Sequence, residues 1–482
     1  MSPPIVTKKL DDYRWIIPKS GKMNAEGIIY ADSPMMESLR EDGSLQQVMN
    51  VACLPGIVGR SMAMPDIHWG YGFPIGGVAA FDAETGVISP GGVGYDINCG
   101  VRLMRSELEA AQVADSLPKI VKALFQNIPS GIGSKRKDLR ISAKQMNNVL
   151  KKGVRWAASE GFARTDDTPY IEAGGCIPGA DPNTVSERAY NRGRNQLGTL
   201  GSGNHFIEVG VVDSIYDGPA AQAMGLEPGQ LTVMVHTGSR GLGHQVCDDY
   251  IQVLLKAAGK HHIDLPDKQL CCAPIRSSEA KRYLSAMACA ANFAFCNRQI
   301  IGYWVEETFQ EVLQMSARAI GLSLVYDICH NMAKQETHEV DGRSRSLCIH
   351  RKGATLALPP YAEGLPERYR QVGQPVLIPG DMGRSSHVLA GTETGWKETF
   401  GSCCHGAGRV LSRKQAKKSA KGRAIIRELE DRGIYVQSAG KGTVAEEMSD
   451  AYKDVDKVVD IVHNAGIAKK VAKLAPLGVI KG

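Results

Sequence analysis

Four separate segments of the sequence place metal-binding side chains at the end or the start of an apolar run. Asp96 and Cys99 lie three residues apart in GGVGYDINCG, a spacing that lets a turn direct a carboxylate and a thiolate at one ion. His205 opens an apolar run, and His236 and His330 each end one. Nitrogen, sulfur and oxygen ligands together suit a divalent transition metal, and ligand softness alone favours zinc or iron over manganese.

A fifth segment, GSCCHGAGRVLSRK, places His405 before a Gly-Ala-Gly turn that leads into a basic stretch. A single histidine at a strand end is more often a hydrogen-bonded structural residue than a ligand. The recurrence of the pattern in distant segments weakens that interpretation, because glycine-rich strand ends let the backbone approach a ligand closely. We therefore expect these side chains to form the rim of one site built from strand ends.

The residues around these side chains predict the strands that position them. The glycine-rich stretch 50–105 predicts short strands joined by tight turns, and 165–185 is predicted to be a loop. Apolar runs predict further strands over 205–212, 231–236, 323–329 and 375–379.

Apolar residues at helical spacing predict the helices. The clearest helix begins at Ser277 or Ser278, either of which could cap it, and runs to about Leu313 with an expected break at Gly302. Other helices are predicted over 108–127, 142–160, 408–431 and 445–474. Strands and helices alternate irregularly without a repeat or a low-complexity linker, which favours one α+β unit.

Composition narrows the class of protein. The 482 residues carry 57 Lys+Arg against 51 Asp+Glu, and this net charge of +6 is compatible with nucleic-acid binding but too small to demonstrate it. No stretch approaches the roughly 18 apolar residues that a membrane span needs, which disfavours membrane insertion and secretion. The 12 scattered cysteines form no C-x-x-C pair, so we expect reduced thiols and a cytoplasmic protein.

Taken together, the motifs resemble one known family. MPDIHWGYGFPIGG, GYDINCGVRL, LGSGNHFIEV, HTGSRGLGHQV, ICHN, HRKGAT, GSCCHGAGR and a terminal Lys-Gly follow one another from residue 64 to the C-terminus. This combination resembles the RtcB family of RNA-splicing ligases. The resemblance implies one catalytic domain over residues 1–482, with an α+β fold of layered sheets flanked by helices around a metal cleft.

The resemblance also implies an activity. The family joins RNA ends bearing a 3′-phosphate or 2′,3′-cyclic phosphate to 5′-hydroxyl ends, and it uses GTP and manganese. The implied partners are RNA ends, such as tRNA halves or cleaved RNA, together with GTP and an optional activating protein. The resemblance therefore implies two Mn²⁺ ions, in place of the zinc or iron that ligand softness alone favours.

Each motif residue receives an implied role. The two Mn²⁺ ions would be held by Asp96, Cys99, His205, His236 and His330, with Cys99 shared, and His405 would accept GMP. The guanosine and its phosphates would be surrounded by Asn204, Glu208, Asn331, Asp381, Ser386, Gly406, Ala407, Gly408, Tyr452 and Lys481. Residues near the RNA ends would be Asp66, Arg240 and Arg409.

The implied chemistry is physically coherent. A neutral His405 imidazole can attack the α-phosphate of GTP once two divalent ions screen the phosphate charge, giving a histidine–GMP phosphoramidate. Transfer of GMP to an RNA 3′-phosphate gives a diphosphate, and the 5′-hydroxyl then expels GMP; a cyclic phosphate must first be opened. Backbone N–H groups of 406–408 suit phosphate.

One turn departs from the family pattern. PGDMGRSSHVL has Asp381 and Arg384 where the family has small neutral residues. A carboxylate beside a triphosphate repels it unless it is compensated. We therefore hypothesise that Asp381 pairs with Arg384 or another cation, or points away from the phosphates.

Two other functions compete with the ligase. One is a metal-dependent enzyme that opens cyclic phosphates or caps 3′-phosphates with GMP without efficient joining. The other is a non-catalytic RNA-binding scaffold that uses the basic stretch 408–423. His405 and the five predicted metal ligands argue against the scaffold, and a solvated helix face explains the basic stretch equally well.

The other histidines are interpreted as structural, with His68 and His350 as the strongest exceptions.

Overall fold

The strands next to the predicted metal ligands pair with one another in one mixed sheet. The computed structural model describes residues 5–139, 141–163 and 165–482. Within these residues, each strand in question begins or ends within one residue of a predicted ligand. These strands are β7 (Gly100–Glu109), β8 (Phe206–Ile215), β9 (Gln230–Thr237) and β11 (Ser323–Cys329).

The antiparallel register of this sheet brings the ligand-bearing ends to the same edge. It pairs Cys329 with Gly100, Gly100 with Thr237, His236 with Phe206, and Phe206 with Lys481. Cys99, His205 and His330 each flank one of these paired residues in the chain. The expected convergence of strand ends therefore follows directly from strand register.

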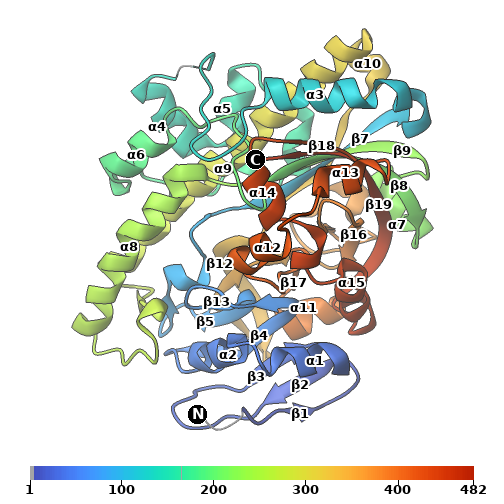
Figure 1. Cartoon of the computed structure of the whole chain (residues 1–482). Helices are drawn as coiled ribbons and strands as arrows, with labels where there is room; N and C mark the ends of the chain where they lie inside the picture. Colours follow the sequence, from blue (N-terminus) through green and yellow to red (C-terminus); the bar gives the residue numbers. More distant parts are fainter. Residues whose placement is uncertain (1–4, 140, 164) are drawn as a thin grey trace.

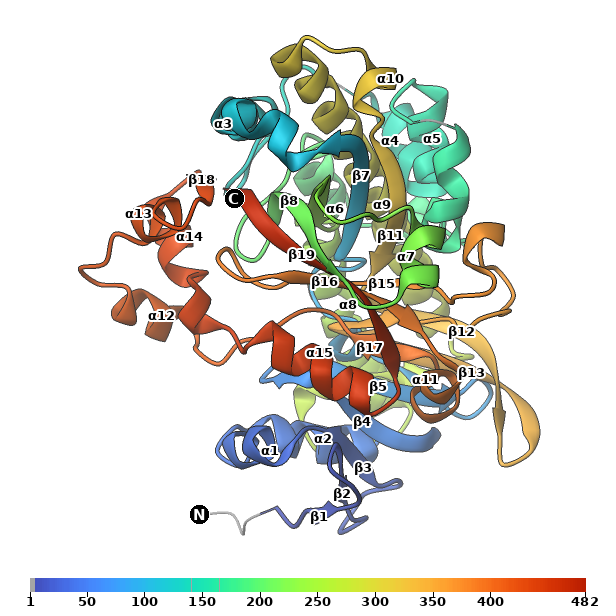
Figure 2. The same cartoon turned by 90° about the vertical axis from the view of Figure 1, so that its right-hand side faces the viewer.

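The same sheet continues on the other side of β8, in the order β11-β7-β9-β8-β19-β16-β15, with β18 pairing parallel to β19. Its remaining strands are β15 (Pro375–Ile378), β16 (Ser386–Gly391), β18 (Tyr435–Ser438) and β19 (Ala468–Lys481). The short helices α13 (Ile425–Glu430) and α14 (Lys441–Glu446) contact β18, and α12 (Arg413–Ser419) packs against α14 (Figure 2).

A second sheet lies below the first in Figure 1, in the order β1-β2-β3-β4-β5-β13-β12, and only β3 and β4 among the pairs described are parallel. Its strands are β1 (Lys8–Lys9), β2 (Arg14–Ile17), β3 (Gly27–Tyr30), β4 (Ile57–His68), β5 (Ile75–Asp82), β12 (Asn331–Val340) and β13 (Arg343–Lys352). Short pairs are formed by β6 (Val87–Ile88) with β10 (Ala273–Pro274), and by β14 (Ala354–Leu356) with β17 (Ser402–Cys404).

The helices cover the sheets and connect them; α15, for example, contacts both β4 and β19. The bounds are α1 (Ser33–Leu39), α2 (Ser44–Ala52), α3 (Leu117–Asn127), α4 (Ala143–Lys152), α5 (Val154–Ser159), α6 (Glu187–Gly193), α7 (Gly218–Met224), α8 (Arg240–Lys260), α9 (Ser278–Leu313), α10 (Ala317–Ile320), α11 (Glu393–Thr399), α12 (Arg413–Ser419), α13 (Ile425–Glu430), α14 (Lys441–Glu446) and α15 (Val455–Asn464). No helix of the described residues is long and apolar enough to cross a membrane.

Helix α9 begins where the sequence predicts, because the Ser277 side chain accepts a hydrogen bond from Ala280 N–H. The expected break at Gly302 is wrong, since α9 continues to Leu313. A Cβ atom at Gly302 would lie 3.0 Å from a guanidinium nitrogen of Arg102. The glycine therefore makes room for a buried arginine rather than bending the helix.

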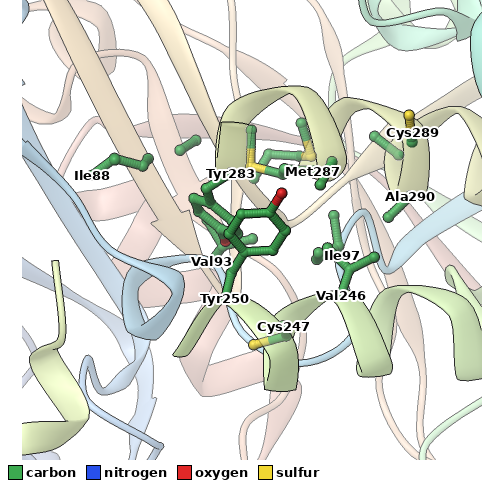
Figure 3. Packing of buried hydrophobic residues seen from close by; sticks show 14 of the residues in the cluster. Ile88, Val93, Ile97, Val246, Cys247, Tyr250, Tyr283, Met287, Cys289 and Ala290 are labelled. Carbon is green, nitrogen blue, oxygen red and sulfur yellow. The ribbon is translucent and has the colours of Figure 1, made fainter. Parts of the chain in front are cut away.

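An apolar core between α8 and α9 anchors the loop that carries Asp96 and Cys99. Val93 and Ile97 of this loop are fully buried among side chains of both helices, including Val246 and Met287 (Figure 3). Burial of a valine or isoleucine side chain stabilises a fold by about 1.5–3 kcal/mol. The loop is therefore held in place on both sides of Asp96.

Two predicted helices are partly strands. Residues 108–109 end β7, and a 3₁₀ helix over Ala110–Ser116 precedes α3. The predicted helix over 445–474 ends with α15 at Asn464, and residues from Ala468 belong to β19. There β8 and β16 pair with both sides of the strand, and this pairing outweighs the helical spacing of the apolar residues.

Two other predicted helices are divided. The helix over 142–160 separates into α4 and α5 at Gly153, which has φ of 52°. The segment 408–431 forms α12 and α13 instead of one helix. The strands predicted over 205–212, 231–236, 323–329 and 375–379 are confirmed, whereas the stretch 50–105 begins in α2 and includes the 12-residue strand β4 as well as shorter strands. The predicted loop over 165–185 is confirmed, with 3₁₀ turns and one isolated β-bridge at Ile171. One domain over 1–482 stays a prediction.

Candidate active site

The predicted metal ligands form a contiguous cluster at the shared strand edge. The Cys99 Sγ lies 3.4 Å from His205 Nε2 and 3.3 Å from His236 Nε2. The His236 and His330 Nε2 atoms are 3.3 Å apart, and Asp96 Oδ2 lies 2.9 Å from His205 Nε2. Among the described residues these donors fall into two groups, Cys99–His236–His330 and Asp96–Cys99–His205, which share Cys99.

The orientation of His205 fits a cation. Its Nδ1 lies 3.0 Å from the Leu200 carbonyl oxygen, so this nitrogen carries a proton that it donates. In the neutral ring, Nε2 is then an acceptor, yet it faces the Asp96 carboxylate and the Cys99 sulfur. A cation between these three atoms satisfies all of them, and the donor set is one that transition metals accept.

Burial sets the protonation of the cluster. It lowers the pKa of His236 and of His330 well below the usual range, so both rings are neutral, as a metal ligand must be. Burial and the charge of Asp96 raise the pKa of the Cys99 thiol well above its usual value. Burial opposes ionisation of Asp96, but hydrogen bonding to His205 holds its pKa well below the usual range. Metal binding at Cys99 must therefore displace a proton.

A fully buried arginine of α9 holds the turns around the cluster. Arg298 Nη1 donates to the carbonyl oxygens of Asn98 (2.8 Å) and Thr237 (3.0 Å), and its Nε donates to Asp327 Oδ1 at 2.8 Å. Asp327 also accepts from Arg102 at 2.9 Å. Sequence analysis missed these residues. The available signal was an arginine within the apolar run ANFAFCNRQII.

His405 directly follows β17 and is oriented by a buried carboxylate. Its Nδ1 lies 2.5 Å from Asp66 Oδ2, and its backbone N–H donates to the same oxygen at 3.0 Å. Asp66 is fully buried, and the rings of His405 and His330 have centroids 4.8 Å apart. The carboxylate fixes the proton on Nδ1, which leaves the Nε2 lone pair of a neutral ring free to act as a nucleophile.

A cavity of about 720 Å³ joins the cluster to His405. This volume is in the range of small-molecule sites. The predicted residues that line it are Asp96, Cys99, His236, His330, His405, Asn204, Glu208, Asn331, Asp381, Gly406, Ala407, Gly408, Arg409, Tyr452 and Lys481.

The other predicted residues lie behind the cavity wall. His205 adjoins it through Cys99, and Asp66 lies behind His405. Ser386 is fully buried and donates to Glu208 Oε1 at 3.2 Å. Arg240 donates from Nε to Thr199 Oγ1 at 3.3 Å. The expected contacts of Asp66 and Arg240 with RNA, and of Ser386 with the nucleotide, stay predictions.

Asn331 already uses both ends of its side-chain amide. Its Nδ2 donates to the Asp96 carbonyl oxygen at 3.0 Å, and its Oδ1 accepts from Gly353 N–H at 2.9 Å. It therefore ties the Asp96 loop to the end of β13. Its expected contact with the nucleotide stays a prediction.

Two acidic side chains, Glu208 and Asp381, line the cavity close to one another. Burial raises the pKa of Glu208 to about 8, and the nearby charge of Asp381 adds to this effect. Asp381 Oδ1 accepts from Gly383 N–H at 3.0 Å and from Ser449 Oγ at 2.5 Å, and its Oδ2 lies 3.6 Å from Arg384 Nη1. The structure thus contains the Asp381–Arg384 ion pair that the sequence analysis hypothesised.

A buried acid that sequence analysis missed organises the C-terminal side of the cavity. Glu447 is fully buried, accepts a hydrogen bond from the Tyr452 hydroxyl, and lies 3.2 Å from Arg409 and 3.9 Å from Lys481. Burial lowers the pKa of Lys481. Glu447 thus holds three predicted site residues together, and nothing in VAEEMSDAY distinguishes it from the preceding glutamate.

The two exceptional histidines differ. His68 lines the cavity, with Nδ1 2.9 Å from the Asp66 carbonyl oxygen. His350 is fully buried, and its Nε2 accepts from Ser89 N–H at 3.1 Å between Phe73 and Phe81, which indicates a structural residue.

Comparison with known proteins agrees with this geometry. The sequence model of a family described as tRNA-splicing ligase RtcB matches residues 47–482. The chain is 52% identical to the tRNA-splicing ligase RtcB of Archaeoglobus fulgidus over 479 residues, which is 99% of each chain. It is 53% identical to that of Thermococcus kodakarensis over 98% of each chain. The RNA-splicing ligase RtcB of Mycobacterium tuberculosis is 50% identical over 90% of this chain and all of its own.

Proposed function

Because the chain belongs to the RtcB family of tRNA-splicing ligases, an enzyme family, we propose that it joins RNA 3′-phosphate or 2′,3′-cyclic phosphate ends to 5′-hydroxyl ends. GTP supplies the energy through a histidine–GMP intermediate, and two Mn²⁺ ions assist. tRNA halves or other cleaved RNA ends are the substrates. This detailed mechanism rests on the geometry of the site.

The placement of His405 carries the proposal. Its ring lies against His330 of the donor cluster, in the cavity that also contains Glu208 and the 406–408 turn. Asp66 keeps the proton on Nδ1, so Nε2 attacks the α-phosphorus of GTP and pyrophosphate leaves. As the Nε2–P bond forms, positive charge develops on the ring, and the buried Asp66 carboxylate stabilises it.

The two donor groups, Cys99–His236–His330 and Asp96–Cys99–His205, would hold two divalent ions, and Cys99 belongs to both groups. Bound there, divalent ions supply charge neutralisation for the phosphates of GTP and RNA. The protein itself keeps His236 and His330 neutral by burial and holds the Asp96 loop by its apolar neighbours.

The remaining steps regenerate His405. An oxygen of the RNA 3′-phosphate attacks the phosphorus of the histidine-bound GMP, breaking the N–P bond and forming an RNA diphosphate with GMP. The 5′-hydroxyl of the second RNA then attacks the RNA phosphorus and loses its proton, and GMP leaves. Lys481, Gly406 and Gly408 line the cavity, where the Lys481 ammonium and the backbone N–H groups of the two glycines would contact the phosphates; the Ala407 N–H instead donates to the Pro379 carbonyl oxygen at 3.2 Å.

The proposal is tested by incubating the protein with α-³²P-labelled GTP and Mn²⁺. We expect a covalent adduct that is labile in acid and stable in base, with no adduct for His405→Ala and normal labelling for His463→Ala, which changes an exposed histidine of α15. Labelling of His405→Ala would contradict the assignment of His405 as the nucleophile.

The same assay separates the alternatives when RNA ends are added. Joined product supports the ligase, whereas RNA that accumulates with a GMP cap and is not joined supports the capping enzyme. RNA binding without any adduct in the wild type supports the scaffold. Cys99→Ala should lose both ions, and retention of two tightly bound Mn²⁺ would contradict the shared thiolate.

A further inference from the structure

A large exposed aromatic side chain stands at the edge of the cavity. Trp69 directly follows β4, lines the cavity and is 56% exposed. The described residues give its indole no hydrogen-bond or ring partner. Burial of an aromatic ring is strongly favourable, so an open tryptophan beside an active site is a feature that needs a function.

The backbone around Trp69 is fixed. Gln47 of α2 is buried, and its side-chain amide donates to the Gly70 carbonyl oxygen at 2.6 Å and accepts from Gly70 N–H at 3.0 Å. The indole lies against Gly43, where a Cβ atom would approach the ring to 2.5 Å. One part of the ring is therefore supported by backbone while the rest stays open, as in a rigid stacking platform.

Other rings extend the aromatic surface toward the donor cluster. Tyr71 and Tyr95 line the same cavity with centroids 5.4 Å apart, and His244 lies 4.8 Å from Tyr95. Tyr95 precedes the predicted ligand Asp96. Trp69 is itself three residues from Asp66, which in extended chain is about 10 Å. A platform at this distance suits a base within the first few nucleotides of an end that reacts at His405.

The charges at the rim decide which part of a nucleic acid lies on Trp69. Asp42, next to Gly43, lines the cavity and would repel a phosphate. Cations line another part of the rim, where the Arg413 side chain is 59% exposed and pairs with Glu446 and Glu447 only at 3.8 Å. This division favours a base at Trp69 and the backbone on the basic side.

We propose that Trp69 is a stacking platform for a nucleobase near the end of a single-stranded RNA, and this rests on the proposed RNA-joining function. The platform distinguishes an unpaired end from a duplex, in which the base is covered by its neighbours. Stacking on an aromatic side chain is tolerant of sequence, because every base has a π-face.

Direct binding of short single-stranded RNA, measured by fluorescence anisotropy without GTP, tests the platform. Trp69→Ala should weaken binding about tenfold and Trp69→Phe should restore most of it. Tyr216→Ala should bind as the wild type, because Tyr216 is an exposed aromatic next to Ile215, at the far end of β8 from the cavity. Melting temperatures check that the variants fold.

An abasic series makes the test specific. Each RNA in the series lacks a single base at one of the three terminal positions, on either a 3′-phosphate strand or a 5′-hydroxyl strand. We expect the RNA that lacks the stacking base to bind the wild type about tenfold more weakly than the intact RNA. This tenfold loss of affinity should vanish in Trp69→Ala. The strand in which the loss occurs, 3′-phosphate or 5′-hydroxyl, identifies the RNA end that stacks on Trp69. An undiminished penalty in Trp69→Ala, or full affinity of that variant for intact RNA, overturns the platform.

The outcome is separable from the proposed function. If the wild type forms the GTP adduct and binds RNA but Trp69 has no effect, only the platform fails. If the wild type binds none of these RNAs, both proposals fail.

Discussion

At the residue scale, the chemistry of His405 depends on a carboxylate that presents one oxygen to two donors. Asp66 Oδ2 accepts from both the ring and the backbone N–H of His405. The ring is thus fixed relative to its own main chain and keeps a single tautomer. The resemblance assigned Asp66 to the RNA ends, which stays a prediction; its burial and its two contacts with His405 support a role in positioning the proposed nucleophile.

Asp66→Asn should slow adduct formation by about 10²–10⁴-fold, because an amide can donate to Nδ1 and favour the wrong tautomer. The rate of labelling by GTP measures this effect, with Mn²⁺ content as a check on the fold. Asp42→Asn is the matched control, since Asp42 lines the cavity and has no hydrogen bond to His405 among the described residues. Equal rates for Asp66→Asn and wild type would contradict the positioning role.

We expect the Glu208 carboxyl to make GTP binding depend on pH. Burial raises its pKa to about 8, so it is protonated in the free protein at neutral pH. If the ionised form accepts the N1–H and N2–H of guanine, binding releases this proton, and affinity rises with pH up to about 8 and then levels. We expect about a tenfold gain from pH 6.5 to 7.5, measured by calorimetry. Glu208→Gln should bind GTP weakly, and its affinity should not rise with pH. An unchanged pH dependence in this variant would contradict the assignment of Glu208 as the titrating group.

The Asp381 carboxylate is compensated by its neighbours. An uncompensated unit charge ~6 Å from a phosphate would cost on the order of 3 kcal/mol at an effective dielectric constant of about 20, or roughly a hundredfold in affinity. Hydrogen bonds from Ser449 and Gly383 and the ion pair with Arg384 reduce this repulsion. Asp381→Ser should therefore change GTP affinity less than about tenfold. A hundredfold tightening would show that the carboxylate faces the phosphates uncompensated.

At the scale of the elements, the strand ends that carry the ligands were predictable and their partners were not. Apolar runs beside glycine turns located β8, β9 and β11, because β9, nearly all of β11 and the first half of β8 are buried on both faces. The apolar residues of β19 have helical spacing, so the sequence predicted a helix there. Only the pairing with β8 and β16 selects the strand. The residues that hold the site act through contacts that no local pattern records: Arg298 contacts Asn98, 200 positions away, and Glu447 contacts Arg409, 38 positions away.

Arg298 links three elements, and its loss should affect both stability and metal binding. Arg298→Met leaves Asp327 paired only with Arg102 and removes the donors to Asn98 and Thr237. We expect a loss of about 3–5 kcal/mol in the free energy of unfolding and about 10–100-fold weaker Mn²⁺ binding. Chemical denaturation and metal titration measure these, with exposed Arg318→Met as control.

A milder variant keeps this prediction testable if Arg298→Met does not fold. Asn98→Gly preserves the positive φ of 53° but removes the side-chain acceptor that lies 3.0 Å from Arg298 Nη2. It should weaken Mn²⁺ binding with a smaller loss of stability. Unchanged metal affinity in both variants would show that the arginine supports only the fold.

At the scale of the whole molecule, one cavity is lined by residues from Asp42 to Lys481. Both sheets and the C-terminal helices contribute to its wall, and Lys481 reaches it because β19 pairs with β8 up to Phe206. A ligand in the cavity would contact segments of both sheets and of the C-terminal helices at once. Binding should therefore be coupled to the stability of the entire chain and not to one element.

Mn²⁺ and GTP should each raise the melting temperature. A ligand at 100 times its Kd that binds only the folded state stabilises it by about 2.7 kcal/mol, which for a chain of this size corresponds to a shift of a few degrees. Cys99→Ala should lose the Mn²⁺ shift because the thiolate belongs to both donor groups, whereas His405→Ala should keep it because His405 is in neither. Differential scanning calorimetry with chelator-treated protein measures the shifts. An equal Mn²⁺ shift in Cys99→Ala would place the ions elsewhere.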